Sequence, residues 1–274
     1  MNVGERGEIL LKIKLTEKRD RGETFNGEAI ISVGFDGREY GSVPQEYYDI
    51  GESVIDNSRY DGYIEKIARV MSIGKASTSN KSDIHINRKG YSVKSSAVRA
   101  ALINHTNRSG FERVCGEVKT DIGPLDEMIN EYWHRRMQGI INEDISNSNP
   151  NSPFKDHKEY FRPILEYFLF SGSGSRKSAN PAEYILEYSK FFDDKTWSVL
   201  TKEEAVDKVW PNLVFSLRSK KGMPQNYTLD YRGPDAESIK KWVRKMDGQY
   251  KGALHVRVSK SKNAINKGPN LDDF

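Results

Sequence analysis

Hydrophobic and polar positions alternate near the start of the chain. Residues 8–15, EILLKIKL, and residues 28–35, EAIISVGF, place aliphatic side chains at every second position over much of their length. A period of two is typical of strands whose two faces meet different surroundings. Asn26 and Gly27, between the two runs, favour a turn. The pattern therefore predicts an N-terminal β-hairpin.

The segment at residues 60–74 has a helical pattern instead. Its apolar side chains recur at intervals of three or four residues: Ile64, Ile67, Ala68 and Met71. That spacing puts them on one face of a helix, and Gly74 is a typical residue just past a helix end. We expect a short amphipathic helix here.

Residues 82–96, SDIHINRKGYSVKSS, contain two alternating runs joined by a turn, which we place at residues 88–90. Ile84 and Ile86 share one face of the first strand because side chains alternate along a strand. Pairing the apolar faces of the two strands brings three polar side chains together on the other face: Asp83, Ser92 and Lys94. The segment therefore predicts a hairpin with a polar constellation.

The rest of the chain alternates helix and strand signals. We expect helices at residues 97–107, 125–139, 181–192 and 234–246, and a further helix that Thr201 and Glu204 begin as a capping box. Strands are expected at residues 111–118, 212–221 and 253–258. Residues 146–152, SNSNPNS, predict either a boundary between residues 1–145 and 153–274 or a long surface loop within one continuous domain.

Composition limits the cellular setting. The 274 residues include one cysteine, Cys115, which excludes an internal disulfide and fits a reducing compartment. No stretch is long and apolar enough to span a bilayer. We therefore expect a soluble, cytoplasmic protein without a membrane partner. The net charge is only +4, but residues 201–262 hold 14 Lys or Arg against 7 Asp or Glu, so basic charge is concentrated late in the chain.

The polar constellation suits the hydrolysis of a phosphodiester. A carboxylate such as Asp83 binds a hard cation, and an ammonium such as Lys94 can orient the attacking water and stabilise charge on phosphorus. The segments SDI at 82–84 and SVKS at 92–95, followed by LINHT at 102–106, resemble the PD-(D/E)xK nuclease superfamily. They are similar in particular to type II restriction endonucleases of the HpaII-like S-(I/V)-K-S variant.

The resemblance implies an α/β (α+β) fold with a restriction-endonuclease-like core at residues 60–145, in which helices flank a mixed sheet. It implies Mg²⁺ as cofactor, with Asp83 and the Val93 carbonyl as ligands and Lys94 as the catalytic lysine. The family usually has Glu or Asp two residues before the lysine, where this chain has Ser92. The missing acid is then expected from Glu65, or alternatively from Glu112.

A basic segment late in the chain is the candidate DNA-reading region. Arg and Lys pair with phosphates, and Arg, Asn and Gln also contact base edges. The residues expected to contact DNA are Asn104, Arg218, Lys220, Lys221, Gln225, Asn226 and Arg232. The resulting hypothesis is a sequence-specific, Mg²⁺-dependent endonuclease of a prokaryotic restriction-modification system. It would act as a homodimer on double-stranded DNA, alongside a methyltransferase of the same system.

Two other functions stay open. A repair or phage nuclease of the same fold would recognise DNA structure instead of sequence. A DNA-binding protein without catalysis is the second alternative, which the serine at position 92 leaves open. Its DNA affinity would fall with rising salt, and it would cut with no divalent ion.

Overall fold

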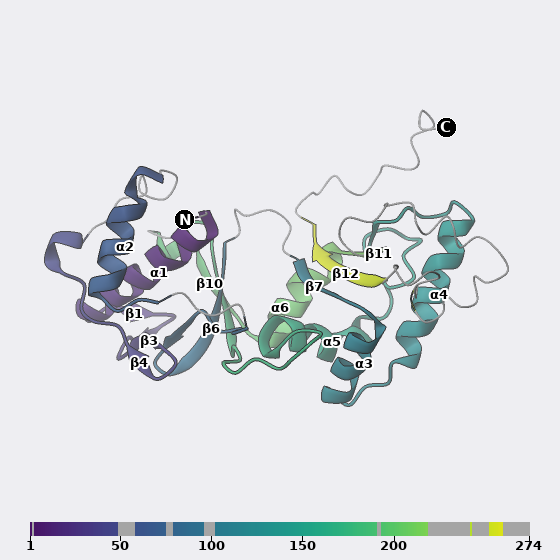
Figure 1. Cartoon of the computed structure of the whole chain (residues 1–274), viewed down its shortest axis with the longest axis horizontal. Helices are drawn as coiled ribbons and strands as arrows, with labels where there is room; N and C mark the ends of the chain where they lie inside the picture. Colours follow the sequence, from purple (N-terminus) through teal and green to yellow (C-terminus); the bar gives the residue numbers. More distant parts are fainter. Residues whose placement is uncertain are drawn as a thin grey trace. The chain divides into compact units, whose positions relative to one another are not determined.

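The computed structural model of the protein describes residues 1, 3–48, 58–74, 79–95, 102–190, 193–218, 242 and 252–259 (Figure 1). The chain divides into two compact units. Unit 1 comprises Met1–Val98, Phe170–Gly172 and Ser178–Ala205, and unit 2 comprises Arg99–Leu169, Ser173–Lys177 and Val206–Phe274. This division differs from a split between residues 145 and 153, because residues 146–152 lie inside unit 2 and a later segment returns to unit 1.

Unit 1 is built on a mixed sheet of six strands in the order β10-β9-β6-β5-β3-β4. β6 and β9 are parallel, and the other neighbouring pairs are antiparallel. The strands are β3 (Val33–Phe35), β4 (Arg38–Glu39), β5 (Ile84–Ile86), β6 (Lys89–Ser95), β9 (Tyr184–Tyr188) and β10 (Trp197–Leu200). A separate pair is formed by β1 (Thr24–Phe25) and β2 (Glu28–Ala29).

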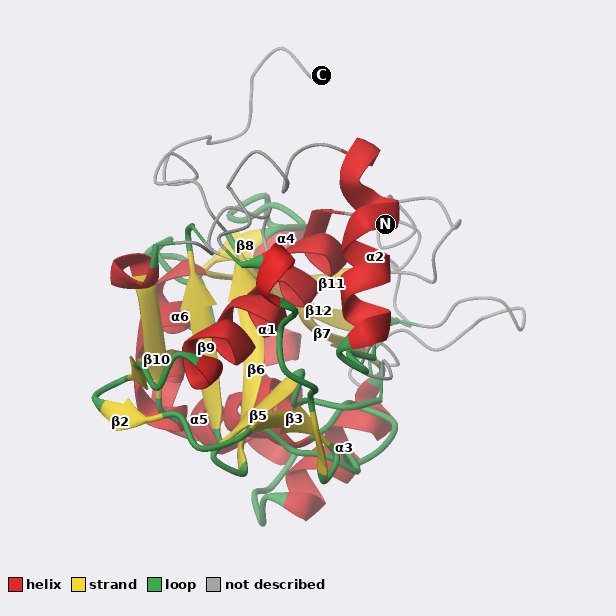
Figure 2. Ribbon diagram, turned by 90° about the vertical axis from the view of Figure 1, so that its left-hand side faces the viewer, coloured by secondary structure: helices red, strands yellow, loops and turns green. Residues whose placement is uncertain are grey.

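Two helices cover one face of this sheet, α1 (Val3–Asp20) and α2 (Asp61–Val70) (Figure 2). The core between helices and sheet includes Leu11 and Ile64 from the helices and Ile84, Tyr91 and Leu186 from the strands. Short 3₁₀ turns complete the unit at Gln45–Tyr47, Ser58–Tyr60 and Asp194–Thr196. One face of the sheet therefore packs against α1 and α2 and forms the hydrophobic core of unit 1.

Residues 8–15 belong to α1, so the predicted first strand is wrong. Four of its aliphatic side chains are at most 2% exposed: Leu10, Leu11, Ile13 and Leu15. At 100° per residue they point in several directions around the helix, which is typical of a helix buried on more than one side. Such a helix has no clear apolar stripe, and its alternation imitated a strand.

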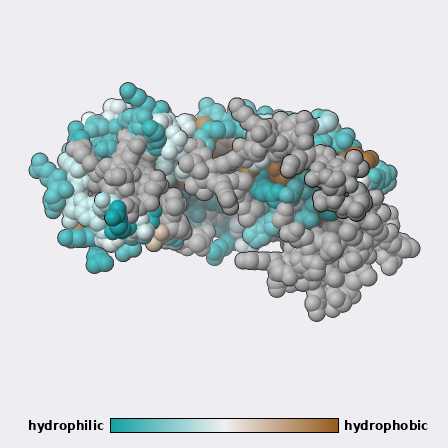
Figure 3. Space-filling model, turned by 90° about the horizontal axis from the view of Figure 1, so that it is seen from above, coloured by the Kyte–Doolittle hydropathy of each residue, from teal (hydrophilic) through white to brown (hydrophobic). Residues whose placement is uncertain are grey.

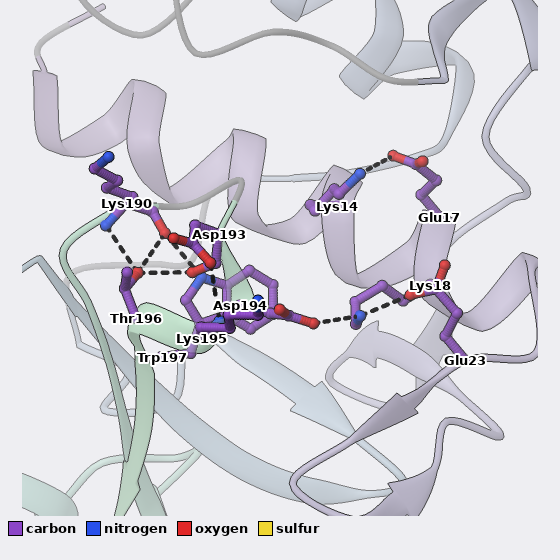
Figure 4. A network of polar contacts seen from close by, with 10 residues as sticks. All are labelled: Lys14, Glu17, Lys18, Glu23, Lys190, Asp193, Asp194, Lys195, Thr196 and Trp197. Atoms are coloured by element: carbon purple, nitrogen blue, oxygen red, sulfur yellow. Dashed lines mark hydrogen bonds and ion pairs between the residues drawn. The ribbon is translucent and has the colours of Figure 1, made fainter.

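Polar residues of α1 are buried in pairs. Lys12 donates to Glu8 at 2.6 Å, and Lys14 donates to Glu17 at 3.0 Å. Lys18 reaches out of the helix to Glu23 at 2.7 Å and to Asp194 at 2.8 Å (Figure 4). Pairing offsets the desolvation of these charges, so α1 can be buried despite its polar composition.

Unit 2 contains an antiparallel sheet of four strands in the order β7-β12-β11-β8. These are β7 (Leu102–Thr106), β8 (Ile145–Ser146), β11 (Leu213–Arg218) and β12 (Ala253–Val258). Its helices are α3 (Arg108–Glu117), α4 (Gly123–Met137) and α5 (Lys158–Glu166), with a 3₁₀ turn at Trp210–Asn212. The π-helical turn at Tyr167–Ser171 and α6 (Lys202–Val209) each include residues of both units. An aromatic-rich core joins them, with Phe111, Phe154 and Phe215 fully buried.

In two neighbouring segments, a strand replaces an expected helix and a helix replaces an expected strand. Leu102–Thr106, expected in a helix, is strand β7, and the expected strand at 111–118 is largely helix α3. β7 pairs with the distant β12, and such pairing outweighs a local pattern. Asn107 begins α3 by accepting a bond from the Gly110 N–H at 3.0 Å. The remainder of the expected helix, residues 97–101, lies outside the described residues.

The expected helix at 181–192 is also wrong, because Tyr184–Tyr188 forms β9, between β10 and β6 in the sheet of unit 1. Its near-continuous apolar run is typical of a strand buried on both faces. Asn180 does not cap a helix. Its carbonyl accepts bonds from the backbone N–H groups of Lys81 and Ser82 at 3.0 and 2.9 Å.

Other expectations are confirmed. The helix after residue 60, the 82–96 hairpin, the helix near 125–139 and the strands near 212–221 and 253–258 are all present. Thr201 and Glu204 form the predicted capping box, with the Thr201 N–H donating to Glu204 at 2.9 Å. The protein thus combines helices with mixed and antiparallel sheets. The expected helix at 234–246 falls outside the described residues, apart from Trp242.

Where the structure describes the chain, no helix is both long and apolar enough to cross a membrane. The described surface in Figure 3 is mostly hydrophilic, with few hydrophobic side chains. Large hydrophobic side chains exposed on the described residues include Ile31, Tyr60, Tyr63, Val70 and Ile140.

Candidate active site

The hairpin of β5 and β6 positions the polar constellation. Ile84 pairs with Tyr91, and Ile86 pairs with Lys89, so the turn consists of Asn87 and Arg88 and is one residue earlier than expected. Both turn residues have positive φ, 51° and 66°, as a type I′ hairpin turn requires. The register places Asp83 beside Ser92, on the face that points away from the helices of unit 1.

Three predicted side chains meet there. Asp83 Oδ2 accepts a hydrogen bond from the Val93 N–H at 2.7 Å and another from Ser92 Oγ at 3.3 Å. Lys94 Nζ lies 3.8 Å from the same oxygen. Ser92 is 2% exposed, whereas the side chains of Asp83 and Lys94 are 20% and 49% exposed. The prediction that Asp83, Ser92 and Lys94 lie together is confirmed, and the two charged groups are partly exposed.

Lys81 is a further basic residue of this site that the sequence analysis missed. Burial, together with the nearby Lys94 ammonium, lowers the pKa of Lys81 to about 8, against the opposing effect of Asp83. Lys81 stands two positions before Asp83. The alternation of side chains that grouped Asp83 with Lys94 could therefore have placed Lys81 on the same face. The site therefore holds one carboxylate among two lysines.

The low pKa of Lys81 is directly measurable. In a protein with ¹³C-methylated lysines, we expect one NMR resonance to titrate near pH 8, well below the ordinary value of 10.5. Lys81 is then mostly protonated below pH 8 and mostly neutral above it. A Lys81→Arg variant should lack this resonance. Titration of every lysine above pH 10 would contradict the burial of this side chain.

A neighbouring segment holds the hairpin in place. Ser82 Oγ donates to the Pro181 carbonyl at 2.7 Å, and the Glu183 N–H donates to the Gly90 carbonyl at 2.8 Å. The Gly90 N–H in turn donates to the Glu183 carboxylate at 3.1 Å. Because Ser82 is fully buried and precedes Asp83 directly, these bonds fix the start of the strand that carries the carboxylate.

Gly90 is expected to tolerate no side chain. An added Cβ would overlap Ser82 Oγ and lie 2.9 Å from the Pro181 carbonyl oxygen, so the hairpin or the adjacent segment must shift. We expect Gly90→Ala to lower the free energy of unfolding by about 1–3 kcal/mol in urea denaturation. Gly62→Ala is the control, since a Cβ at that α2 position meets nothing within 4 Å. Equal stability of both variants would refute the close packing at Gly90.

The two acids expected to complete the site lie on different helices and in different units. Glu65 lies on the exposed side of α2. Glu65 therefore lies on the other side of the sheet of unit 1 from Asp83. Glu112 lies on α3 in unit 2, is 56% exposed, and pairs with Arg108 at 3.3 Å. Within the described ranges, no three His, Cys, Asp or Glu side chains gather as a metal-binding group.

Of the residues expected to contact DNA, Asn104 and Arg218 lie in the described part of the chain. Asn104 lies in β7 and is buried in unit 2, with 8% of its surface exposed. Arg218 is the last residue of β11. The other five positions lie outside the described residues: Lys220, Lys221, Gln225, Asn226 and Arg232.

The oxygen atoms of the site fit a hard divalent cation. Asp83 supplies a carboxylate. Paired strand residues exchange both of their hydrogen bonds, so the N–H and C=O of one residue point to the same side of a strand. Since the Val93 N–H points at Asp83, the Val93 carbonyl also points to that side. Carboxylate and carbonyl oxygens are the ligands that Mg²⁺ prefers in proteins.

Comparisons of the chain with models of protein families, with curated proteins and with solved structures find no match. What the site does is therefore inferred from its own residues.

Proposed function

We propose that this protein is a Mg²⁺-dependent endonuclease that hydrolyses phosphodiester bonds in double-stranded DNA, with an active site of the PD-(D/E)xK type. The observation that carries the proposal is the contact of Asp83 with Lys94 across the β5–β6 hairpin. An aspartate that precedes one strand and a lysine on its antiparallel neighbour form the central pair of that family's site. Three features of the chain support a role in catalysis.

First, Asp83 is held as a ligand. The Val93 N–H and the Ser92 hydroxyl both donate to its Oδ2, and these bonds fix the position of the carboxylate. With the Val93 carbonyl, Asp83 would hold the cation. The bound ion would stabilise charge on the phosphate and lower the pKa of a water molecule.

Second, Lys94 is placed to act on the attacking water. Its side chain is 49% exposed and begins on the central strand β6, so its ammonium reaches the surface beside Asp83. There it can orient the water by hydrogen bonding and stabilise the negative charge that develops on phosphorus. Asp83 limits the freedom of the ammonium, which keeps Lys94 in the position for this role.

Third, the two lysines favour an anionic substrate. Lys81 and Lys94 influence each other electrostatically and flank one carboxylate. A phosphodiester adds the negative charge that this surface lacks. DNA recognition would then fall to the late basic segment, with Arg218, Lys220, Lys221, Gln225, Asn226 and Arg232 contacting phosphates and base edges.

The biological setting that fits this activity is a restriction-modification system in the cytoplasm of a prokaryote. Symmetric recognition sites in both strands are cut most simply by a homodimer with one site per strand. A methyltransferase that modifies the same sequence would protect the cell's own DNA. A structure-directed nuclease is the second candidate, because a single carboxylate among lysines recognises phosphate without reading bases.

Digestion of unmethylated plasmid and bacteriophage DNA, compared with branched DNA junctions, distinguishes the candidates. Discrete fragments that form only with Mg²⁺ are the expected result. Cleavage confined to junctions would favour the structure-directed nuclease. Intact DNA on all substrates, together with salt-dependent binding in a gel-shift assay, would favour a DNA-binding protein without catalysis and overturn the proposal.

A further inference from the structure

Strand β9 brings a second carboxylate to the face of the sheet that carries Asp83 and Lys94. β9 runs parallel to β6, and Glu187 pairs in register with Lys94. Side chains of paired residues project from the same face of a sheet, and neighbouring strands lie about 4.8 Å apart. Glu187 therefore stands directly beside Lys94, on the opposite side of β6 from Asp83.

The burial of β9 agrees with this placement. Leu186 and Tyr188 are 0% and 5% exposed and belong to the core beneath α1 and α2. Because side chains alternate along a strand, Glu187 projects from the other face. It is half-buried there, in a strand whose other four residues are all apolar or aromatic.

Position 92 on β6 holds a short serine in place of an acid. Ser92 is on β6, between the strand that follows Asp83 and strand β9. Its side chain extends one heavy atom beyond Cβ, so it does not fill the face of β6 as a glutamate would. Ser92 lies beside Asp83 on one side and pairs with Ile185 of β9 on the other, so Glu187 lies diagonally across β6 from Asp83, next to Lys94.

The balance of charges at the site also favours a role for Glu187 in cation binding. With Asp83 alone, one carboxylate offsets the charges of Lys81 and Lys94 only in part, so a divalent cation would bind more weakly than beside two acids. Glu187 adds a second negative charge at the position next to Lys94. Two carboxylates beside two lysines allow a cation to bind without excess positive charge.

We propose that Glu187 is the second acid of this site and binds the divalent cation together with Asp83, in the role that a carboxylate at position 92 would otherwise have. This inference rests on the proposed nuclease function. Mg²⁺ is usually held through one or two carboxylates and keeps several of its waters. Glu187 contacts the ion directly or through one of those waters.

Mn²⁺ binding to the full-length protein, measured by isothermal titration calorimetry without DNA, tests the assignment. We expect Glu187→Gln to weaken Mn²⁺ binding about tenfold or more, and Asp83→Asn to weaken it at least as strongly. Glu28→Gln is the matched control. Glu28 also pairs with a lysine of the same hairpin, Lys89 at 3.0 Å, but at the exposed end of β6, and its loss should leave Mn²⁺ affinity unchanged.

The outcomes separate this inference from the proposed function. Wild-type Mn²⁺ affinity in Glu187→Gln, with affinity lost in Asp83→Asn, overturns the role of Glu187 and leaves the metal site at Asp83 standing. Absence of Mn²⁺ binding by the wild-type protein overturns both. Should circular dichroism show that Glu187→Gln is unfolded, Glu187→Asp replaces it. Retracting the carboxylate by one methylene should weaken Mn²⁺ binding, and unchanged affinity overturns the assignment.

Discussion

Replacement of Lys94 by Met is expected to reduce Mg²⁺-dependent DNA cleavage by about 10²–10⁴-fold, the range that a positioned acid–base group contributes. Methionine keeps the approximate length of the side chain and removes the ammonium that lies 3.8 Å from Asp83. DNA affinity should fall by no more than about tenfold, because one cation among many phosphate contacts is lost. Single-turnover cleavage and gel-shift titration measure the two effects separately.

Lys89→Met is the matched control for Lys94. Both lysines lie on β6, but Lys89 pairs with Glu28 at the exposed end of the strand, away from Asp83. We expect this variant to cleave at the wild-type rate. Persistent cleavage by Lys94→Met would remove the proposed site. Equal losses in both variants would indicate a general effect of positive charge on DNA binding.

Replacement of Phe154 by Ala is expected to lower the free energy of unfolding by about 3–5 kcal/mol, as for other fully buried aromatic residues. Phe154 is fully buried, and its ring stacks on Phe215 with 4.3 Å between centroids. It also contacts the rings of Phe161 and Tyr132. Urea denaturation followed by tryptophan fluorescence measures the loss.

This variant also tests the role of the segment around residue 150. Ser146–Ser152 leads directly to Phe154, so this polar stretch would belong to the folded body of unit 2 and would not be a linker. Ile140→Ala, at a side chain that is 47% exposed, should change stability by less than about 0.5 kcal/mol. If Phe154→Ala were as mild as this control, the segment would be peripheral to the core.

The central hairpin could be predicted from the sequence because its pairing is local. Ile84 and Tyr91 alternate regularly around a two-residue turn, and parity alone then places Asp83 beside Ser92 and Lys94. The same parity would have identified Lys81. Helix α2 was equally predictable, since one face of it is buried and the other is exposed.

Segments with distant partners could not be predicted in this way. β7 depends on pairing with β12, and β9 depends on its parallel register with β6. Local patterns at 102–106 and 184–188 suit helices as well as strands, and only tertiary pairing decides between them. Glu187 was missed for this reason, because its position beside Lys94 follows from the β6–β9 register and not from any spacing in the sequence.

Digestion of unmethylated bacteriophage DNA by the wild-type protein and by Asp83→Asn, each with Mg²⁺ and with EDTA, tests the central claim most directly. We predict discrete fragments from the wild-type protein with Mg²⁺ and intact DNA in the other three reactions. The substitution leaves an amide of the same shape that can still accept the Val93 N–H bond, so loss of cleavage would report on the charge. Cleavage by Asp83→Asn at the wild-type rate, or wild-type cleavage in EDTA, would contradict a metal-dependent site at this hairpin.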